Sequence, residues 1–336
     1  LLSERGKDVF ILINHVTLSS LFCLFGIAGN FINIRVFLKQ GLKRSTNLSF
    51  FTMAVTDTLE IVFQIWHNVC LNPYLLHVDS SVDFYEIQYL TAGTPSVLLV
   101  RITGWITVYV TAERCLSIAA PLKIKQIVTP RRTAAILVFI YVMNYAGLIP
   151  IYFAAYFSWK LSPARNRTKL GMSFRDDVDQ ILSSTSSFHS GMTVTAFVLV
   201  IIFTSILVFF LKQKSKWRRA STAQAGQTGT VSSRERKTVF TVIVVAAVLI
   251  VCYTPGISFD FVTSINQDFS LTGKHANVFQ AAWSFAFLLH SVNSSINVLL
   301  YYKTSTRYRQ TVRGMFPRCF KNRGPSAKTN TANTTR

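Results

Sequence analysis

Seven long apolar stretches, separated by polar segments, constrain the fold of this chain more than any other feature. A helix that crosses the hydrocarbon core of a bilayer needs about 20 mostly apolar residues. We therefore expect an all-α membrane protein whose seven transmembrane helices form a bundle. The expected spans cover about 11–38, 47–71, 90–118, 133–156, 188–211, 238–265 and 276–302.

The charge is divided unevenly between the two sets of connecting segments. The net charge is +21, and 24 of the 35 Lys and Arg residues follow spans one, three, five and seven. The opposite segments hold eight basic and nine acidic residues. Because short cytoplasmic loops collect Lys and Arg, we expect a plasma-membrane protein with residues 1–10 outside and residues 317–336 in the cytoplasm. The same segregation argues against a nucleic-acid partner, which would require basic residues on folded, water-facing surfaces.

Residues 303–316 alternate in basic and aromatic character and predict a short cytoplasmic amphipathic helix on anionic membrane lipid. Cys319 behind it is a candidate palmitoylation site, although a lone tail cysteine is as often unmodified. Asn166 begins an Asn-Arg-Thr glycosylation acceptor in the expected second outer loop. Ser221 follows two arginines and an alanine, a pattern typical of a phosphorylation site for basic-directed kinases.

Polar, charged and proline residues occur at characteristic places in five of the spans. In chain order they are Asn30, Asp57, Glu113-Arg114, Pro255 and Asn297 to Tyr301. Their joint order and spacing resemble the rhodopsin-like (class A) G-protein-coupled receptors over essentially the whole chain. The resemblance implies a receptor that binds an extracellular chemical or peptide and activates a heterotrimeric G protein, with arrestin as a further partner.

The segment from 111 to 133 is further similar to the chemosensory receptors described in molluscs, so we expect a chemosensory role. A neuropeptide receptor of the same fold is the alternative. The chain also departs from the family pattern. Tyr89 stands where the usual disulfide cysteine is expected, and no cysteine occurs between Cys115 and Cys252, which leaves the conformation of the second outer loop open.

The resemblance also implies which residues couple the receptor to the G protein. Arg114 would hold the resting state beside Glu113 and then turn toward the G protein; the alternative is an interfacial arginine that reaches water. Pro255 removes a backbone hydrogen bond and kinks span six, with Tyr253 as an aromatic switch, although such kinks also serve packing alone. The expected coupling and activation residues are Glu113, Arg114, Tyr253, Pro255, Asn297 and Tyr301.

Asp57 lies in the middle of a span, where an unpaired carboxylate is costly. The family pattern implies that the oxygens around it hold an allosteric Na⁺ ion, or waters, that are released on activation. The alternative is a hydrogen-bonded polar core without ion binding. The implied site consists of Asp57, Thr103, Asn293, Ser294 and Asn297.

Ionisable residues in the outer halves of the spans are the default indicators of a ligand pocket. Arg101 suits an anionic group such as a carboxylate. The alternatives are that Glu60 and Arg101 neutralise each other and that His290 serves packing. No lysine lies between Lys274 and Lys303, so a retinal Schiff base of the opsin kind is excluded, and no other cofactor is required. The expected pocket residues are Glu60, Ser96, Arg101, Asp260, Trp283, Phe287 and His290.

A transporter or channel is the rival class of protein. The sequence has neither the internal repeat typical of secondary transporters nor the rings of charge or filter loop of a channel. It also lacks a His-Glu-x-x-His motif, a nucleophile elbow and a phosphate loop, so we do not expect an enzyme. The five cysteines match neither a metal-site spacing nor a disulfide framework.

Overall fold

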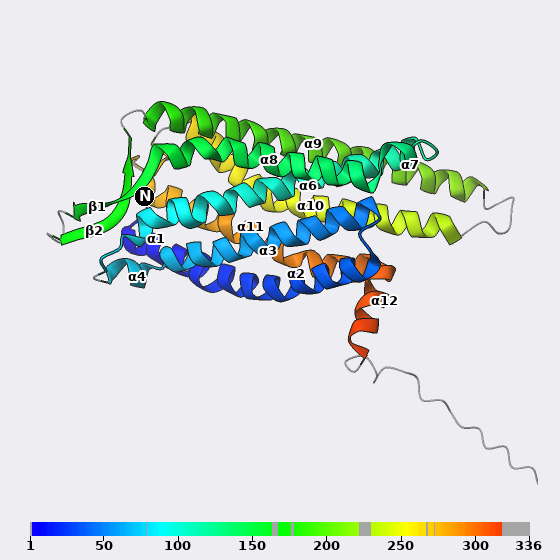
Figure 1. The fold of residues 1–336 in the computed structure, drawn as a ribbon, viewed down its shortest axis with the longest axis horizontal. Coiled ribbons are helices and arrows are strands. Elements are labelled where there is room, and N and C mark those ends of the chain that lie inside the picture. The colour runs from blue at the N-terminus through cyan, green and yellow to red at the C-terminus, as the bar shows by residue number, and fades with distance from the viewer. Residues whose placement is uncertain are drawn as a thin grey trace, which may run out of the picture.

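The computed structural model describes residues 2–78, 80–162, 167–175, 178–221, 230–266, 268–271 and 273–317 as a bundle of long helices (Figure 1). Short helical segments extend two of the long helices at their N-termini. The first half of the chain forms α1 (Glu4–Ile11), η1 (Leu12–Ser19), α2 (Ser20–Gln40), α3 (Ser45–Cys70), α4 (Pro73–His77), α5 (Phe84–Gln88), η2 (Tyr89–Gly93), α6 (Thr94–Ala119), α7 (Ile124–Ile127) and α8 (Pro130–Ala154). The second half forms β1 (Ala155–Ser162), β2 (Arg167–Phe174), α9 (Val178–Ser221), α10 (Thr230–Ile265), α11 (Ala276–Thr304) and α12 (Thr306–Met315).

The two ends of the bundle differ in what covers them. The N-terminus, α4 and the two strands lie at one end, and α7 and α12 lie at the other (Figure 1). We name these the hairpin end and the α12 end. Between them α6 packs against α3, α8, α9 and α10, and α11 packs against α2, α3 and α10. Helix α6 therefore carries its polar side chains through the interior of the bundle, as expected for a span with charged residues.

Six helical segments among the described residues are long and apolar enough to cross a membrane. They are Glu4–Gln40, Ser45–Cys70, Phe84–Ala119, Pro130–Ala154, Gln180–Gln213 and Lys237–Ile265. Helix α11 is less apolar because its buried face carries a run of polar side chains, among them Ser291, Asn293 and Asn297. Since α11 also packs within the bundle, the prediction of an all-α membrane bundle is confirmed.

The short helix α12 is anchored to the bundle through Tyr308. The Tyr308 hydroxyl donates to Asn33 Oδ1 on α2 at 2.6 Å, and its ring packs against Tyr301 of α11 and Phe37 of α2. This burial raises the pKa of the Tyr308 hydroxyl above its usual value. A helix whose tyrosine is inserted in this way has a fixed position relative to α2 and α11.

The second long loop contains the strands of the described chain, which the sequence analysis did not predict. Strands β1 and β2 pair antiparallel from Ala155 opposite Phe174 to Ser162 opposite Arg167. The fourth span was expected to reach residue 156, but α8 ends at Ala154 and the next residue already belongs to β1. Aromatic residues and Thr are enriched in strands. A segment with these residues can therefore form a strand where it lies outside the bilayer, even though its composition also suits a membrane helix.

Gly26 of α2 lies against side chains of both α3 and α11. A Cβ atom at Gly26 would lie 2.3 Å from Ser295 Oγ and 2.5 Å from Ile61 Cδ1. We expect Gly26→Ala to lower the free energy of unfolding by about 1–3 kcal/mol, the usual cost of overpacking. In the control Gly191→Ala, the new Cβ meets nothing within 4 Å, so stability should stay unchanged or rise slightly. Thermal unfolding in detergent measures both, and equal melting temperatures for Gly26→Ala and the parent would contradict the prediction.

Candidate functional site

The β-hairpin is tethered without a disulfide. Its backbone joins the segment before α5, because Asp83 N donates to Leu170 O at 2.9 Å and Leu170 N donates to Ser81 O at 2.8 Å. The cysteines in the described part of the chain are all free, and they are Cys23, Cys70, Cys115 and Cys252. The loop whose conformation the sequence left open is therefore held by hydrogen bonds.

Glu86 of α5 provides a second attachment for the hairpin. Its Oε2 accepts a hydrogen bond from Met172 N at 2.6 Å and forms an ion pair with Lys160 Nζ at 2.9 Å. A Cβ atom at Gly171 would lie 2.3 Å from this same oxygen. A larger residue at position 171 would displace the Glu86 carboxylate from β2, and the contacts of this carboxylate attach the hairpin to α5.

Arg101 of α6 is buried at the hairpin end with neutral partners. Its side chain is 7% exposed. Its Nε donates to Thr193 Oγ1 at 3.1 Å, and its Nη1 forms a hydrogen bond with His189 Nδ1. Asp260 of α10 interacts with Arg101 electrostatically, but among the described residues Arg101 forms no ion pair. The guanidinium charge is therefore not neutralised by direct contact.

Glu60 of α3 lies apart from Arg101, so these residues do not neutralise each other by direct contact as one alternative supposed. Glu60 Oε1 accepts from Ser96 Oγ at 3.3 Å, and the same hydroxyl donates to Gln64 Oε1 at 3.1 Å. Glu60 is 1% exposed, and its Oε2 has no hydrogen-bond partner. The expected pocket residues Glu60 and Ser96 thus form one polar group, and Arg101 forms another with α9.

An aromatic row on α11 connects the hairpin end with the middle of the bundle. Trp283 contacts Phe287 with ring centroids 6.2 Å apart, and Phe287 contacts His290 at 5.8 Å. His290 then meets Tyr253 of α10 at 5.4 Å, and the Tyr253 hydroxyl donates to Val100 O at 2.8 Å. Four of the residues expected in the pocket or the switch are therefore in sequential contact.

Sequence reasoning did not identify several partners of these residues. His67 lies 4.5 Å from Phe287 between ring centroids, and His15 lies 5.1 Å from His67. His189 and Thr193 were missed in the same way, although they hold Arg101. The sequence contained the evidence for all three histidines, because each is an ionisable residue inside an expected span, which is the criterion that selected His290.

Asp57 lies in a buried polar group at the centre of the bundle. Thr103 Oγ1 donates to its Oδ1 at 2.9 Å, and Asn297 Nδ2 donates to its Oδ2 at 2.8 Å. Ser294 lies against Glu60 instead, and Asn293 is buried without a hydrogen bond to Asp57. Of the residues implied for an ion site, the structure brings Thr103 and Asn297 to Asp57.

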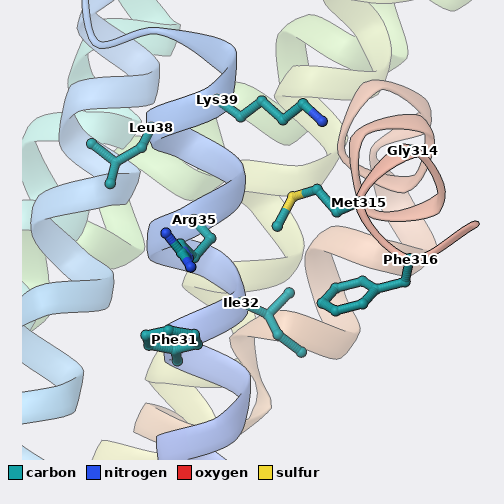
Figure 2. A pocket seen from close by; sticks show the side chains of 8 residues that line it. All are labelled: Phe31, Ile32, Arg35, Leu38, Lys39, Gly314, Met315 and Phe316. Carbon is teal, nitrogen blue, oxygen red and sulfur yellow. The ribbon is translucent and has the colours of Figure 1, made fainter.

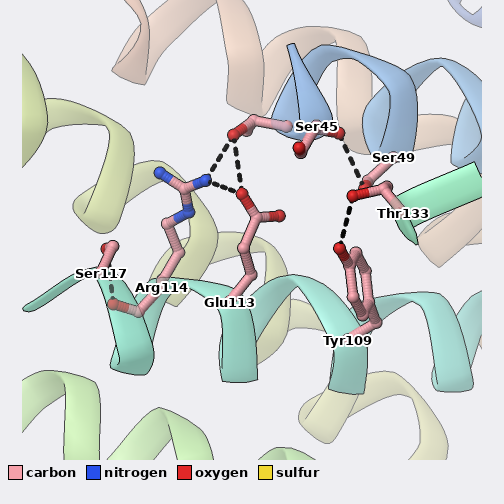
Figure 3. Close-up of polar contacts among 8 residues, drawn as sticks. Ser45, Ser49, Tyr109, Glu113, Arg114, Ser117 and Thr133 are labelled. Carbon is pink, nitrogen blue, oxygen red and sulfur yellow. Dashed lines mark hydrogen bonds and ion pairs between the residues drawn. The ribbon is translucent and has the colours of Figure 1, made fainter. Parts of the chain in front are cut away.

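Glu113 and Arg114 form an ion pair on α6 near the α12 end (Figure 3). Arg114 Nη2 also donates to Thr46 Oγ1 of α3, and this hydroxyl donates to Glu113 Oε1 at 3.3 Å. One turn earlier, the Tyr109 hydroxyl and Thr133 Oγ1 are 2.6 Å apart. The pair is thereby fixed to α3, and Arg114 is restrained toward the interior of the bundle.

The other expected activation residues are spread along α10 and α11. Pro255 lies inside α10, where it removes one backbone donor. Tyr301 is 2% exposed, and its hydroxyl donates to Met53 Sδ at 3.6 Å. Asn297 contacts Asp57 at the centre of the bundle. The expected activation residues therefore extend from this centre toward the α12 end.

Two of the expected modification sites, Asn166 and Cys319, lie outside the described residues. Ser221 is the last residue of α9, at the α12 end of the chain's longest helix. The three modifications therefore stay predictions.

The fold is that of a multi-pass helical membrane protein whose interior combines apolar clusters with many polar side chains. Residues 29–301 match the family described as 7 transmembrane receptor (rhodopsin family). Because the match covers most of the 336 residues, the chain belongs to this family, as the resemblance predicted. A match to receptors favours the receptor class over transporters, channels and enzymes.

Proposed function

We propose that the chain is a G-protein-coupled receptor of the plasma membrane. It binds an extracellular ligand with an anionic group at the hairpin end and activates a heterotrimeric G protein at the α12 end. The observation that carries the proposal is the buried Arg101, whose direct partners are the neutral side chains of His189 and Thr193. A buried charge without a counter-charge in direct contact is costly, and an anionic ligand would supply such a contact, which Asp260 does not make.

The orientation is supported by charge. The segments at the α12 end carry most of the basic residues, which matches the cytoplasmic side of a membrane protein. The hairpin end carries Glu86 of α5 and Lys160 of β1, and it faces outside in this orientation. Arg101 is then reached from the extracellular side, and Arg114 from the cytoplasm.

The proposed ligand is a small chemical or a peptide with a carboxylate. Arginine binds carboxylates through charge-assisted hydrogen bonds that are about twice as strong as neutral ones. A chemosensory role is supported by the sequence resemblance, and a neuropeptide with a free C-terminal carboxylate is the second candidate. A response to free carboxylic acids and amino acids favours the first, and a response confined to peptides favours the second.

We propose that the aromatic row on α11 transmits the effect of ligand binding to α10. The ligand's anionic group would lie beside Arg101 on α6, and its remaining part would reach the rings of Trp283 and Phe287. His290 and Tyr253 then connect these rings to the segment of α10 that contains Pro255. A kink at this proline lets the end of α10 near α12 move outward, which opens the surface where Arg114 meets the G protein. Arrestin is expected at the same surface.

An allosteric Na⁺ ion is proposed between Asp57 and Glu60. Both carboxylates are buried, and Glu60 Oε2 has no hydrogen-bond partner, so the group offers the oxygen ligands that a hard cation requires. Thr103 and Ser294 would complete the site. The cation would lower the repulsion between the two carboxylates and favour the resting arrangement.

Asp57→Asn is expected to abolish the effect of NaCl on agonist affinity. In the parent receptor, replacing choline chloride with NaCl should weaken agonist binding several-fold, by about 1 kcal/mol of coupling. The variant retains acceptor and donor groups for Thr103 and Asn297, so it is expected to fold. Radioligand or fluorescence binding in the two salts measures the effect, and an unchanged sodium dependence in Asp57→Asn would show that the polar core binds no ion.

The proposed function is tested by expressing the chain in cells and measuring guanine-nucleotide exchange on a panel of G proteins. Carboxylic acids, amino acids, peptides and tissue extracts are applied from outside. Ligand-dependent exchange supports the proposal. Ligand-gated current or substrate flux that persists without G proteins would instead assign the chain to a channel or transporter.

A further inference from the structure

A groove lies on the outer surface of the bundle between α2 and the end of α12 (Figure 2). Its volume is about 570 Å³, which falls within the usual range for sites that bind small molecules. Met315 of α12 and Phe316 directly after it point toward α2 near Ile32 (Figure 2). The lining residues are Phe31, Ile32, Arg35, Leu38, Lys39, Gly314, Met315 and Phe316.

Two cations share this groove without an acidic partner. Arg35 and Lys39 are four residues apart on α2 and therefore lie on the same face of the helix, where like charges repel each other. Neither forms an ion pair or a side-chain hydrogen bond among the described residues, and Arg35 instead lies 5.4 Å above the ring of Phe31. An anion placed between the two side chains would remove this repulsion.

The two basic side chains of the groove lie near the end of α2, at the edge of the membrane-spanning part of the bundle. Helix α2 ends at Gln40, so Lys39 lies at the polar boundary and Arg35 about 6 Å deeper, at a rise of about 1.5 Å per residue. The other walls are apolar and partly exposed on a surface that faces lipid in a membrane-spanning bundle. A molecule that fills the groove must therefore combine an anionic head with an apolar body.

We propose that this groove binds one anionic phospholipid, with its phosphate between Arg35 and Lys39. An acyl chain lies along Phe31, Ile32 and Phe316. Zwitterionic phosphatidylcholine carries a choline cation that the two basic side chains disfavour. The bound lipid contacts both α2 and α12 and thereby strengthens the attachment that Tyr308 already makes between them.

The test uses the full chain in nanodiscs with photoactivatable phosphatidylserine that carries a diazirine on its acyl chain. We expect mass spectrometry to locate the adducts within 31–38 and 314–316, several-fold above those formed by the matched phosphatidylcholine probe. Arg35→Ala/Lys39→Ala should lower this labelling by about 30-fold, since each basic residue contributes about fivefold to the attraction of an anionic headgroup. The control Lys123→Ala/Arg131→Ala loses the same charge from exposed positions and should label normally.

A second variant tests the space rather than the charge. A Cβ atom at Gly314 meets nothing within 4 Å, so Gly314→Leu is expected to fold and to fill the groove, which should also reduce labelling. Equal labelling by both probes, full labelling of the Arg35/Lys39 double variant, or displacement of the lipid by inorganic phosphate would overturn the proposal. Nanodiscs present both leaflets, so this outcome does not depend on the proposed orientation or on the receptor's response to ligand.

Discussion

Arg114→Ala is expected to reduce ligand-stimulated nucleotide exchange to the background of cells without receptor, while ligand binding at the hairpin end is retained. In the structure Arg114 is held by Glu113 and by Thr46 of α3. In the proposed active state it leaves these partners and contacts the G protein. Removal of the side chain deletes this contact, and a loss of about 3 kcal/mol would lower exchange by more than 100-fold. Purified receptor and G protein in a GTPγS-binding assay measure the rate.

The substitution Glu113→Gln tests the restraint on Arg114 by Glu113 separately from the contact of Arg114 with the G protein. It keeps Arg114 but removes the charge that holds it, so exchange without ligand should rise by up to about tenfold, the equivalent of about 1.4 kcal/mol. Ser117→Ala is the matched control, because the Ser117 hydroxyl donates to the backbone oxygen of Arg114 at 2.7 Å and not to its guanidinium. Normal exchange by Arg114→Ala would instead identify Arg114 as an interfacial arginine that reaches water.

The bundle was predictable because its determinants are local. A run of about 20 apolar residues specifies a membrane helix from its own composition, and six such segments are found in the described structure. Helix α11 was also expected from the apolar stretch at 276–302, although the polar side chains on its buried face lower its apolar content. The β-hairpin was not predicted, since its attachment depends on Glu86 meeting Met172, a residue 86 positions away.

The charged residues of the candidate site were predictable from the sequence, but the residues that contact them were not. Arg101, Glu60 and Asp57 stand out because an ionisable residue within an apolar span is rare. Which of them face each other depends on the rotation of each helix, which a single sequence does not specify. The sequence therefore left open whether Glu60 and Arg101 neutralise each other, whereas the structure pairs Arg101 with His189 and places Glu60 beside Ser96.

Arg101→Ala is expected to weaken the response to an anionic ligand by about 30- to 100-fold with normal surface expression. The estimate corresponds to the loss of a charge-assisted interaction of about 2–3 kcal/mol. The variant removes a buried charge, and Thr193 Oγ1 keeps its hydrogen bond to the backbone oxygen of His189 at 2.9 Å. Concentration–response curves for nucleotide exchange, with surface receptor counted by an antibody to an N-terminal tag, give the change in potency.

Comparison of paired ligands shows whether the lost interaction is the one proposed. A carboxylate ligand and its neutral amide should differ by the same 30- to 100-fold on the parent receptor, and this difference should vanish on Arg101→Ala, because the variant has no cation to distinguish them. Arg101→Lys keeps the charge without the planar fork and should lie between the two. Thr193→Val removes one hydrogen bond to Arg101 and serves as the control, with a loss of about fivefold. Unchanged potency of the carboxylate on Arg101→Ala would place the ligand elsewhere in the bundle, because a ligand that neutralises Arg101 cannot be indifferent to its removal.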